Sequence, residues 1–414
     1  MTSGFGRLRG FLLGYVALMV IGTALLSLPW AAASEPLTLG QALFTAVSAV
    51  CLVGLTVVNT ATDLSLGGQA VVLLLIQAGA VFYLFFAVLT LRQINRKTTD
   101  LADEPDSSRE VLIRVLKITA LVEGGAFVLI YYTGGGMGGM THKAFGAAFH
   151  AVSAFGNAGF SVLPDNLYAM PRAFVFHLAI LATFVLGGLG IDVLYDLSSP
   201  RRLRQRLANP ATDWRWGTKV SVNGSMLLLG AGAVLFYVLE QHNTLRELNL
   251  TEKLIGSLFQ SGTTRTAGFY TLNVTQLTDA TLAVMIGLML IGGGAGSTAG
   301  GIHTATLIRA FASRKQPPPL IRMRTMARWV IGYALAVNAL GGLVLRFTEP
   351  QQETVALLFA QVSAFSSVGL STVDVATLSS AGQTVLLLSM LLGRVGVLAL
   401  MMYLSGSVSP EFRR

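Results

Sequence analysis

Long apolar runs alternate with short polar connections along the whole chain. Runs of about 20 residues, the length that crosses roughly 30 Å of hydrocarbon as a helix, lie at 11–30, 68–91, 111–132, 173–198, 219–239, 275–312, 326–347 and 380–406. This pattern predicts eight transmembrane helices.

Four shorter apolar segments lie between paired runs, at 39–49, 142–153, 251–262 and 352–363. They are too short to span a bilayer and too apolar to be free loops, so we expect helices that enter the membrane and return. Non-helical backbone at membrane depth is tolerated only where it is packed in protein or lines a watery cavity. Four such segments around one axis would provide that cavity.

A glycine stretch follows each short segment, as "SAVCLVGLTVV", "SAFGNAGFSVL", "TTRTAGFYTLN" and "SAFSSVGLSTV". The glycines Gly54, Gly159, Gly268 and Gly369 are separated by 105, 109 and 101 residues, and three stretches share an S-A-x-x-x-x-G frame. The regular spacing predicts four internal repeats, at residues 1–97, 98–206, 207–320 and 321–414.

Backbone carbonyls in these stretches are candidate ligands for a dehydrated cation, since glycine lets the chain approach an axis and adopt unusual φ/ψ. The predicted filter pairs are Val53 with Gly54, Ala158 with Gly159, Ala267 with Gly268, and Val368 with Gly369, and K⁺ is expected at the four glycines. The short helices would point their negative ends at the ion. Close helix packing is the alternative for any one glycine, but four copies in register favour the filter.

The sixth run contains "GGGAGSTAGG", residues 292–301, which no continuous helix favours because each internal glycine costs up to about 1 kcal/mol. A phosphate-binding loop is the competing interpretation, but the stretch lacks the lysine of a Walker motif. Arg394 lies inside the last apolar run, where a charge is costly unless it faces water or a partner. We expect Arg394 to face a pore rather than snorkel, and Arg265 to brace the third glycine stretch. Asp192 is predicted as an anchor at the cytoplasmic end of its helix, and Glu123 as part of a helix-packing pair.

Composition and charge placement support a membrane protein. The chain is 53% hydrophobic and 12% charged, with a net charge of +9, and 22 of its 29 Lys and Arg residues lie in alternate connections, at 7–9, 92–117, 201–219, 309–328 and 413–414. The positive-inside rule therefore places both termini in the cytoplasm. Acidic residues of the opposite connections, among them Glu35, Asp63, Asp165, Glu252, Asp279, Glu349 and Asp374, would make the outer face mildly anionic. The first run imitates a signal peptide but is longer than a typical hydrophobic core of one.

Other function classes find little support in the residues. The five histidines show no zinc-ligand spacing, and no Ser/His/Asp arrangement indicates a hydrolase, so an enzyme is not expected. The single cysteine, Cys51, excludes an internal disulfide. A proton- or sodium-coupled secondary transporter remains an alternative, although it would show carboxylates at the midplane and a twofold inverted pattern. The basic clusters are expected to hold topology and contact membrane lipid, not nucleic acid.

The chain resembles the TrkH/KtrB family of potassium uptake membrane subunits, within the wider superfamily of Trk, Ktr and HKT transporters, and lies closer to KtrB. The resemblance rests on "GYVALMVIGTALLSLPWA", "QALFTAVSAV", "GRVGVLALMMYL" and, most specifically, "TRTAGF" and "GSTAGGI". It implies an all-α membrane protein with four M1–P–M2 repeats, eight transmembrane helices and four re-entrant pore helices around a pseudo-fourfold central pore. One filter glycine would come from each repeat.

The resemblance also implies function and partners. K⁺ would be the transported ion, and the chain itself would hold no nucleotide site. The 292–301 loop would be an intramembrane gate, formed by Gly292, Gly293, Gly294, Gly296, Ser297, Thr298, Gly300 and Gly301, with Arg394 as a positive barrier beside it. The expected assembly is a homodimer in the plasma membrane, controlled by a cytosolic ring of nucleotide-binding RCK subunits that are similar to KtrA or TrkA.

Selectivity is the property that the motifs leave open. Relatives that conduct Na⁺ commonly have serine at the first filter position, so Gly54 favours K⁺. However, Cys51 and Val53 replace the usual threonines, and "IQAGAVFYLF" at 76–85 replaces a glycine-rich motif. A Na⁺-permeable transporter of the same fold is therefore the alternative.

Overall fold

Helices make up the regular structure of this protein. The computed structural model describes residues 2–98, 107–135, 140–170, 173–208, 214–311 and 318–406. Within these ranges the extended pairing consists of two isolated bridges, Ala32 with Leu64 and Ile291 with Ile302. The all-α prediction is confirmed.

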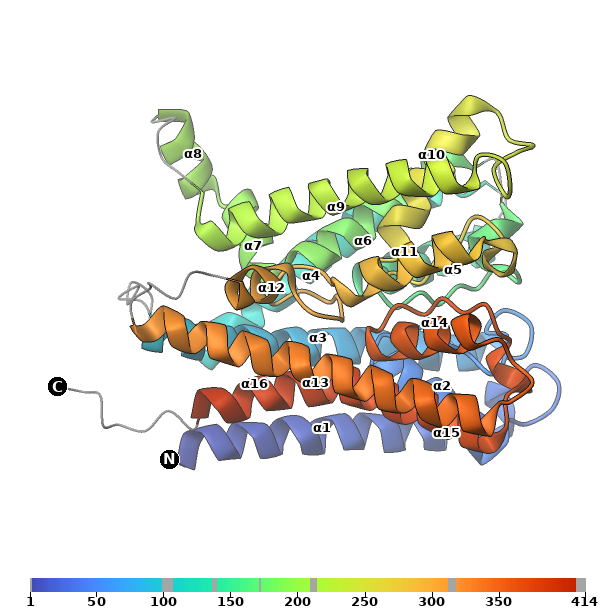
Figure 1. Ribbon diagram of the computed structural model, residues 1–414, viewed down its shortest axis with the longest axis horizontal. Coiled ribbons are helices and arrows are strands. Elements are labelled where there is room, and N and C mark those ends of the chain that lie inside the picture. The colour runs from blue at the N-terminus through green and yellow to red at the C-terminus, as the bar shows by residue number, and fades with distance from the viewer. Residues whose placement is uncertain are drawn as a thin grey trace.

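Long helices lie side by side across the molecule (Figure 1). They are α1 (Thr2–Leu26), α3 (Leu66–Thr98), α4 (Ser108–Thr133), α6 (Phe174–Leu189), α9 (Trp216–Glu240), α13 (Pro318–Thr348) and α15 (Ser380–Leu391), which continues through a π-helical turn (Leu392–Gly396) into α16 (Val397–Gly406). In the described ranges, five helical segments are long and apolar enough to cross a membrane, namely Gly6–Leu26, Leu66–Ile94, Trp216–Glu240, Met323–Thr348 and Ser380–Leu404. Eight spans remain a prediction.

Four short helices lie where short apolar segments were predicted, with each end within two residues. They are α2 (Leu39–Val50), α5 (Met140–Phe155), α10 (Leu250–Thr263) and α14 (Thr354–Phe365). Capping boxes at Thr38 and Asn249 fix the starts of α2 and α10. All four lie toward one end of the molecule, whereas α7 (Ile191–Ser198), α8 (Pro200–Ala208) and α12 (Thr304–Ala310) lie toward the other (Figure 1).

The apolar run 173–198 is not one straight helix, contrary to the prediction of a single transmembrane helix there. It breaks at Gly190 into α6 and α7, which meet at 106°. Gly190 has a φ of +105°, and a Cβ there would collide with the carbonyl oxygen of Ala295. The break therefore makes room for the loop at residues 292–301, and the Ile191 amide donates to the Gly296 carbonyl.

The sixth apolar run, 275–312, is interrupted as its glycines predict. Its helical part, α11 (Asp279–Leu290), has 12 residues and spans about 18 Å, too short for a bilayer. The chain then forms the irregular loop and resumes as α12. Nearly all of the loop is buried in protein, which satisfies the condition for non-helical backbone at membrane depth.

Glutamates join the end of one long helix to the start of the next in two places. Glu240, fully buried at the end of α9, accepts hydrogen bonds from the amide and hydroxyl of Thr278 at 3.0 and 2.9 Å, where α11 begins. Glu349, after α13, accepts from the amide and hydroxyl of Ser379, where α15 begins. Glu349 therefore ties the end of α13 to Ser379, the N-cap of α15, a contact that its predicted place on an anionic outer face did not indicate.

Replacing Glu240 by Ala is expected to lower the free energy of unfolding by roughly 3 kcal/mol, because several hydrogen bonds to a charged acceptor are lost together. Thermal unfolding of the detergent-purified protein measures the effect. Glu247→Ala is the control, since that side chain is 91% exposed. Equal melting temperatures for the two variants would contradict this role of Glu240.

Candidate functional site

The four predicted filter glycines meet in a closed ring. A Cβ on Gly54 would collide with the carbonyl of Ala158, and one on Gly159 would lie 2.8 Å from the Cα of Gly268. In turn, a Cβ on Gly268 would collide with the carbonyl of Val368, and one on Gly369 with that of Val53. Each glycine therefore packs against the next stretch in chain order, and the fourth returns to the first. The ring brings together all eight residues of the predicted filter pairs.

Backbone conformation repeats around this ring. The glycines have φ values of +88°, +70°, +75° and +91°, in the region that side chains disfavour. The residue two positions earlier is also left-handed in every stretch, at Leu52, Asn157, Thr266 and Ser367. When every second residue reverses the sign of φ, successive carbonyls turn toward the same side of the chain. The stretches thus have the geometry of a carbonyl-lined path.

A hydroxyl at the end of each short helix holds its own stretch. Ser48 and Ser363 accept from the amides of Gly54 and Gly369 at 3.1 and 3.0 Å, while Ser153 and Thr263 donate to the carbonyls of Phe160 and Phe269. The S-A frame of the sequence carries this signal. The left-handed backbone at the four non-glycine positions, by contrast, was not predicted, because nothing in those side chains requires that conformation.

The ring forms the floor of an open cavity of about 450 Å³. All four glycines line the cavity, and so do Asp63 and Asp374. The Asn166 amide, also in the lining, donates to the carbonyl of Gly159 at 3.3 Å. Burial, with a smaller contribution from the Asp165 carboxylate, raises the pKa of Tyr270, so this phenol in the lining is neutral. Among the described residues that line it, the cavity therefore carries negative but no positive side chains.

The 292–301 loop packs directly against the glycine stretches that form the ring. The Thr298 hydroxyl donates to the carbonyl of Phe155, at the end of α5, at 2.8 Å. Gly300 packs so closely on Ser366 of the fourth stretch that a Cβ would collide with its carbonyl. Ser297 and Thr298 are at most 1% exposed. The predicted gate residues thus come together directly beside the predicted filter.

Arg394 is the largest fully buried side chain among the described residues, at 1% exposure in the π-helical turn. Its Nη1 donates to the carbonyl of Thr298 at 2.7 Å, and its guanidinium lies 3.7 Å from the centre of the Tyr83 ring. No ion pair joins Arg394 to an acid in the described ranges. A buried positive charge without a counter-ion is consistent with the predicted barrier, although the contact with the loop backbone was not foreseen.

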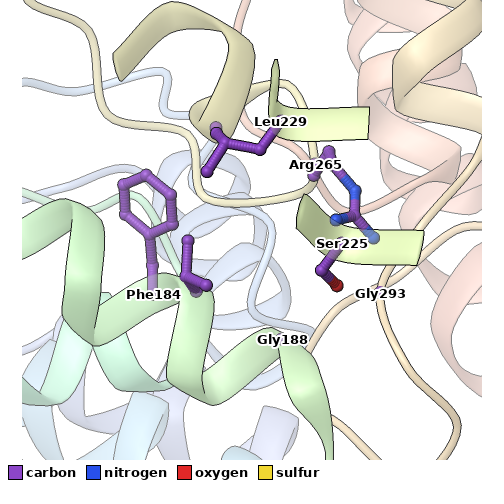
Figure 2. A pocket seen from close by; sticks show the side chains of 8 residues that line it. Phe184, Gly188, Ser225, Leu229, Arg265 and Gly293 are labelled. Carbon is purple, nitrogen blue, oxygen red and sulfur yellow. The ribbon is translucent and has the colours of Figure 1, made fainter. Parts of the chain in front are cut away.

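Arg265 reaches out of the third glycine stretch toward the same loop. Its Nη2 donates to the carbonyl of Gly292 at 2.9 Å. Figure 2 shows the side chain beside Ser225 and Gly293, at a cavity of about 20 Å³, the size of one water molecule. Arg265 was predicted to brace the filter through neighbouring carbonyls or carboxylates, and the group that it contacts is a carbonyl of the loop.

Two further predicted residues have the expected kinds of partner. Asp192 pairs with Arg92 at 3.1 Å and Arg114 at 3.6 Å, and Arg114 also stacks on Tyr195. Glu123 accepts from Gln77 at 3.0 Å across α3 and α4. Both support helix packing and lie outside the ring.

The chemistry available to the ring is coordination by neutral oxygens. The described residues contain no group of three or more His, Cys, Asp or Glu side chains that could hold a metal ion. Carbonyl oxygens in a ring suit a weakly hydrated monovalent cation, which they bind without trapping.

The chain is similar to known transport proteins in sequence and in fold. A family model described as TrkH, cation transport protein, matches residues 14–317. The Ktr system potassium uptake protein B of Bacillus subtilis (strain 168) is 32% identical over 410 residues, which cover 93% of this chain and 90% of that protein. The protein of the same name from Vibrio alginolyticus is 32% identical over 425 residues, covering 95% and 90%. The potassium/sodium uptake protein NtpJ of Enterococcus hirae is 31% identical over 413 residues, covering 93% and 90%.

The fold is also similar to that of a solved structure. The crystal structure titled potassium transporter TrkH from Vibrio parahaemolyticus matches all of this chain and 86% of its own, with a TM-score of 0.73 and 17% identity. At that identity the likeness concerns the fold alone.

Proposed function

Because this chain belongs to the TrkH family of cation transport proteins, we propose that it is the membrane subunit of a K⁺ uptake system. The observation that carries the proposal is the closed ring of four left-handed glycines at the floor of an open cavity. Relatives named as potassium uptake proteins, similar over nine tenths of their length, support the choice of ion.

In the proposed mechanism the ion exchanges its water shell for carbonyl oxygens of the ring. Val53, Ala158, Ala267 and Val368 supply one carbonyl each beside the glycines, in contact with the neighbouring stretch. The four short helices end at the ring, where their negative ends favour a cation and repel anions. Asp63 and Asp374 raise the cation concentration in the cavity outside. The ion then moves down its electrochemical gradient without a chemical reaction.

The loop is the proposed gate of this path. Its residues are buried next to the second, third and fourth stretches, which they contact through Thr298, Gly292 and Gly300. Arg394 holds the loop carbonyl at Thr298 and adds a positive charge beside the path. Both features oppose conduction until the loop moves.

The finer architecture is also part of the proposal. We take the four units of long helix, short helix, glycine stretch and second helix as M1–P–M2 repeats around a pseudo-fourfold pore, with eight membrane crossings. The start of α1 and the end of α16 lie together at the end of the molecule away from the short helices (Figure 1). Both termini would then be cytoplasmic in a plasma-membrane protein.

The proposed assembly follows the family. A homodimer of this chain would carry two pores, and a cytosolic RCK ring would control the gates. The "Ktr system" in the names of the relatives supports additional subunits. Parts of the predicted basic connections lie outside the described residues, namely 99–106, 209–213 and 312–317.

Permeation by both Na⁺ and K⁺ is the second candidate. Cys51 and Val53 replace threonines in the first stretch, and one relative is named a potassium/sodium uptake protein. Gly54 favours the K⁺-selective alternative, because all four ring positions then carry the same unhindered backbone.

Tracer flux in proteoliposomes tests the proposal. Vesicles that hold the purified chain should take up a radioactive Rb⁺ tracer, and external K⁺ should compete better than external Na⁺. Equal competition would favour the second candidate. No flux from correctly folded protein, with or without a cytosolic partner, would refute a conducting pore.

Deleting residues 295–298 is expected to raise uptake by the isolated chain several-fold, because the deletion removes the buried tip of the loop from the proposed path. Uptake is measured per folded molecule in the same vesicles. Ala295→Gly keeps the loop length and should behave like the unmodified chain. Lower uptake by a deletion variant that assembles normally would show that the loop is not an obstruction.

A further inference from the structure

Arg265 connects the third glycine stretch to the neck of the loop. The neck is narrow, since the Gly292 amide donates to Ile302 at 3.0 Å and the Ile302 amide donates to Leu290 at 2.9 Å. The remaining carbonyl of Gly292 accepts from Arg265. One charged side chain thus reaches the point at which the loop leaves α11.

The connection is short on the filter side. Arg265 directly precedes Thr266, Ala267 and Gly268, whose φ values set the direction of the ring carbonyls. Any displacement of the Arg265 backbone therefore changes that turn. On the loop side, Gly292 has no room for a side chain against Gly300, so the two ends of the loop are tightly packed at the neck.

The contact is also costly to break. The Nε of Arg265 is buried without a hydrogen-bond partner, and no ion pair compensates its charge in the described ranges. A hydrogen bond to a charged group stabilises more than a neutral one, and its loss inside protein leaves the charge unsatisfied. The 20 Å³ cavity beside the guanidinium gives it little space to turn elsewhere (Figure 2).

We propose that Arg265 is a positioning residue that couples the ion in the filter to the position of the loop. The inference rests on the proposed function, since it takes the ring as the filter and the loop as the gate. A change in the third stretch that depends on the bound ion would shift the Gly292 carbonyl, and loop movement would shift the stretch in return. Such coupling is reciprocal by thermodynamic necessity.

Thiol labelling of the loop tip measures this coupling directly. Ser297 is fully buried, so a thiol from Ser297→Cys reacts with a water-soluble reagent only when the loop moves. The natural Cys51 is buried, and the chain without the substitution gives its background rate. We expect labelling rates in saturating K⁺ and in saturating Na⁺ to differ by roughly fivefold or more, the usual scale of coupling between sites.

Arg265→Met in the same chain is expected to abolish that ion dependence, so that both ions give one labelling rate. Arg265→Lys keeps a charge and a donor and should retain part of the difference, while melting temperatures show that each variant is folded. If the ion dependence survives in a folded Met variant, Arg265 only braces the filter and the proposal is wrong.

The same experiment separates this inference from the function on which it rests. Ion-independent labelling of a chain that conducts K⁺ would overturn the coupling and leave the proposed function intact. Failure of the unmodified chain to conduct any cation would overturn the function itself.

Discussion

Gly54→Ser is expected to lower the ratio of K⁺ to Na⁺ uptake by about tenfold, which corresponds to about 1.4 kcal/mol of differential stabilisation. Gly54 has a φ of +88°, and a Cβ added at this position would collide with the Ala158 carbonyl. A side chain must therefore displace either its own stretch or the next one. One quarter of the ring is disturbed, and the balance between the ions depends on the number and direction of the carbonyls.

Tracer uptake under K⁺ and Na⁺ competition measures the ratio. Gly40→Ser is the matched control, because Gly40 lies exposed in the short helix of the same repeat and a Cβ there meets nothing within 4 Å. If a folded Gly54→Ser protein kept the unmodified ratio of K⁺ to Na⁺ uptake, this glycine would not be part of the filter.

The short helices were predictable because their signal is local. α2 and α10 start at capping residues, carry apolar residues and end at a glycine stretch, so length and composition alone place them closely. The ring was predictable in outline, since the four glycines recur at nearly regular spacing and three of them share the S-A-x-x-x-x-G frame. The first and fourth stretches even use the same serine-to-amide contact.

Features that depend on contacts between distant segments were not predictable. The bend at Gly190 follows from the presence of Ala295 beside it, 105 positions along the chain, and the apolar run gave no separate signal for it. Glu240 has no local signal for its role, because its partners Thr278 and Thr281 lie 38 and 41 positions along the chain. The left-handed φ of Leu52 is likewise imposed by the ring, against the local preference of a leucine.

The two buried arginines show the same limit in a functional setting. Sequence reasoning detected that Arg394 and Arg265 were unusual, because charges inside apolar surroundings need a partner. It could not give the partner, since both guanidiniums donate hydrogen bonds to backbone carbonyls of the loop, which carry no signal in the sequence. Arg394 holds Thr298 in the loop, and Arg265 holds Gly292 at its neck. The loop is thus held at two points, of which the one at Arg394 also adds a fixed charge beside the proposed path.

Arg394→Ala is expected to raise K⁺ flux per folded molecule by up to about a hundredfold. An arginine side chain brings a fixed positive charge to this position. At an effective dielectric constant of 20, two unit charges about 6 Å apart repel by roughly 3 kcal/mol, enough for that factor if the barrier lies there. Arg394→Lys should keep most of the barrier, because it keeps the charge. Uptake normalised to folded protein compares the three chains.

A neutral variant with a donor separates the charge of Arg394 from its contact with the loop. Arg394→Gln retains an amide that can donate to the Thr298 carbonyl but carries no charge. If electrostatic repulsion limits the flux, Gln should conduct nearly as fast as Ala. If the contact with Thr298 is what holds the path closed, Gln should resemble the unmodified chain.

A purely structural role of Arg394 predicts a third result. Ala would then lower the folded yield, because it empties the space of the largest fully buried side chain among the described residues, while flux per folded molecule stays constant. That result would show that Arg394 is not part of the barrier and that the loop alone closes the path.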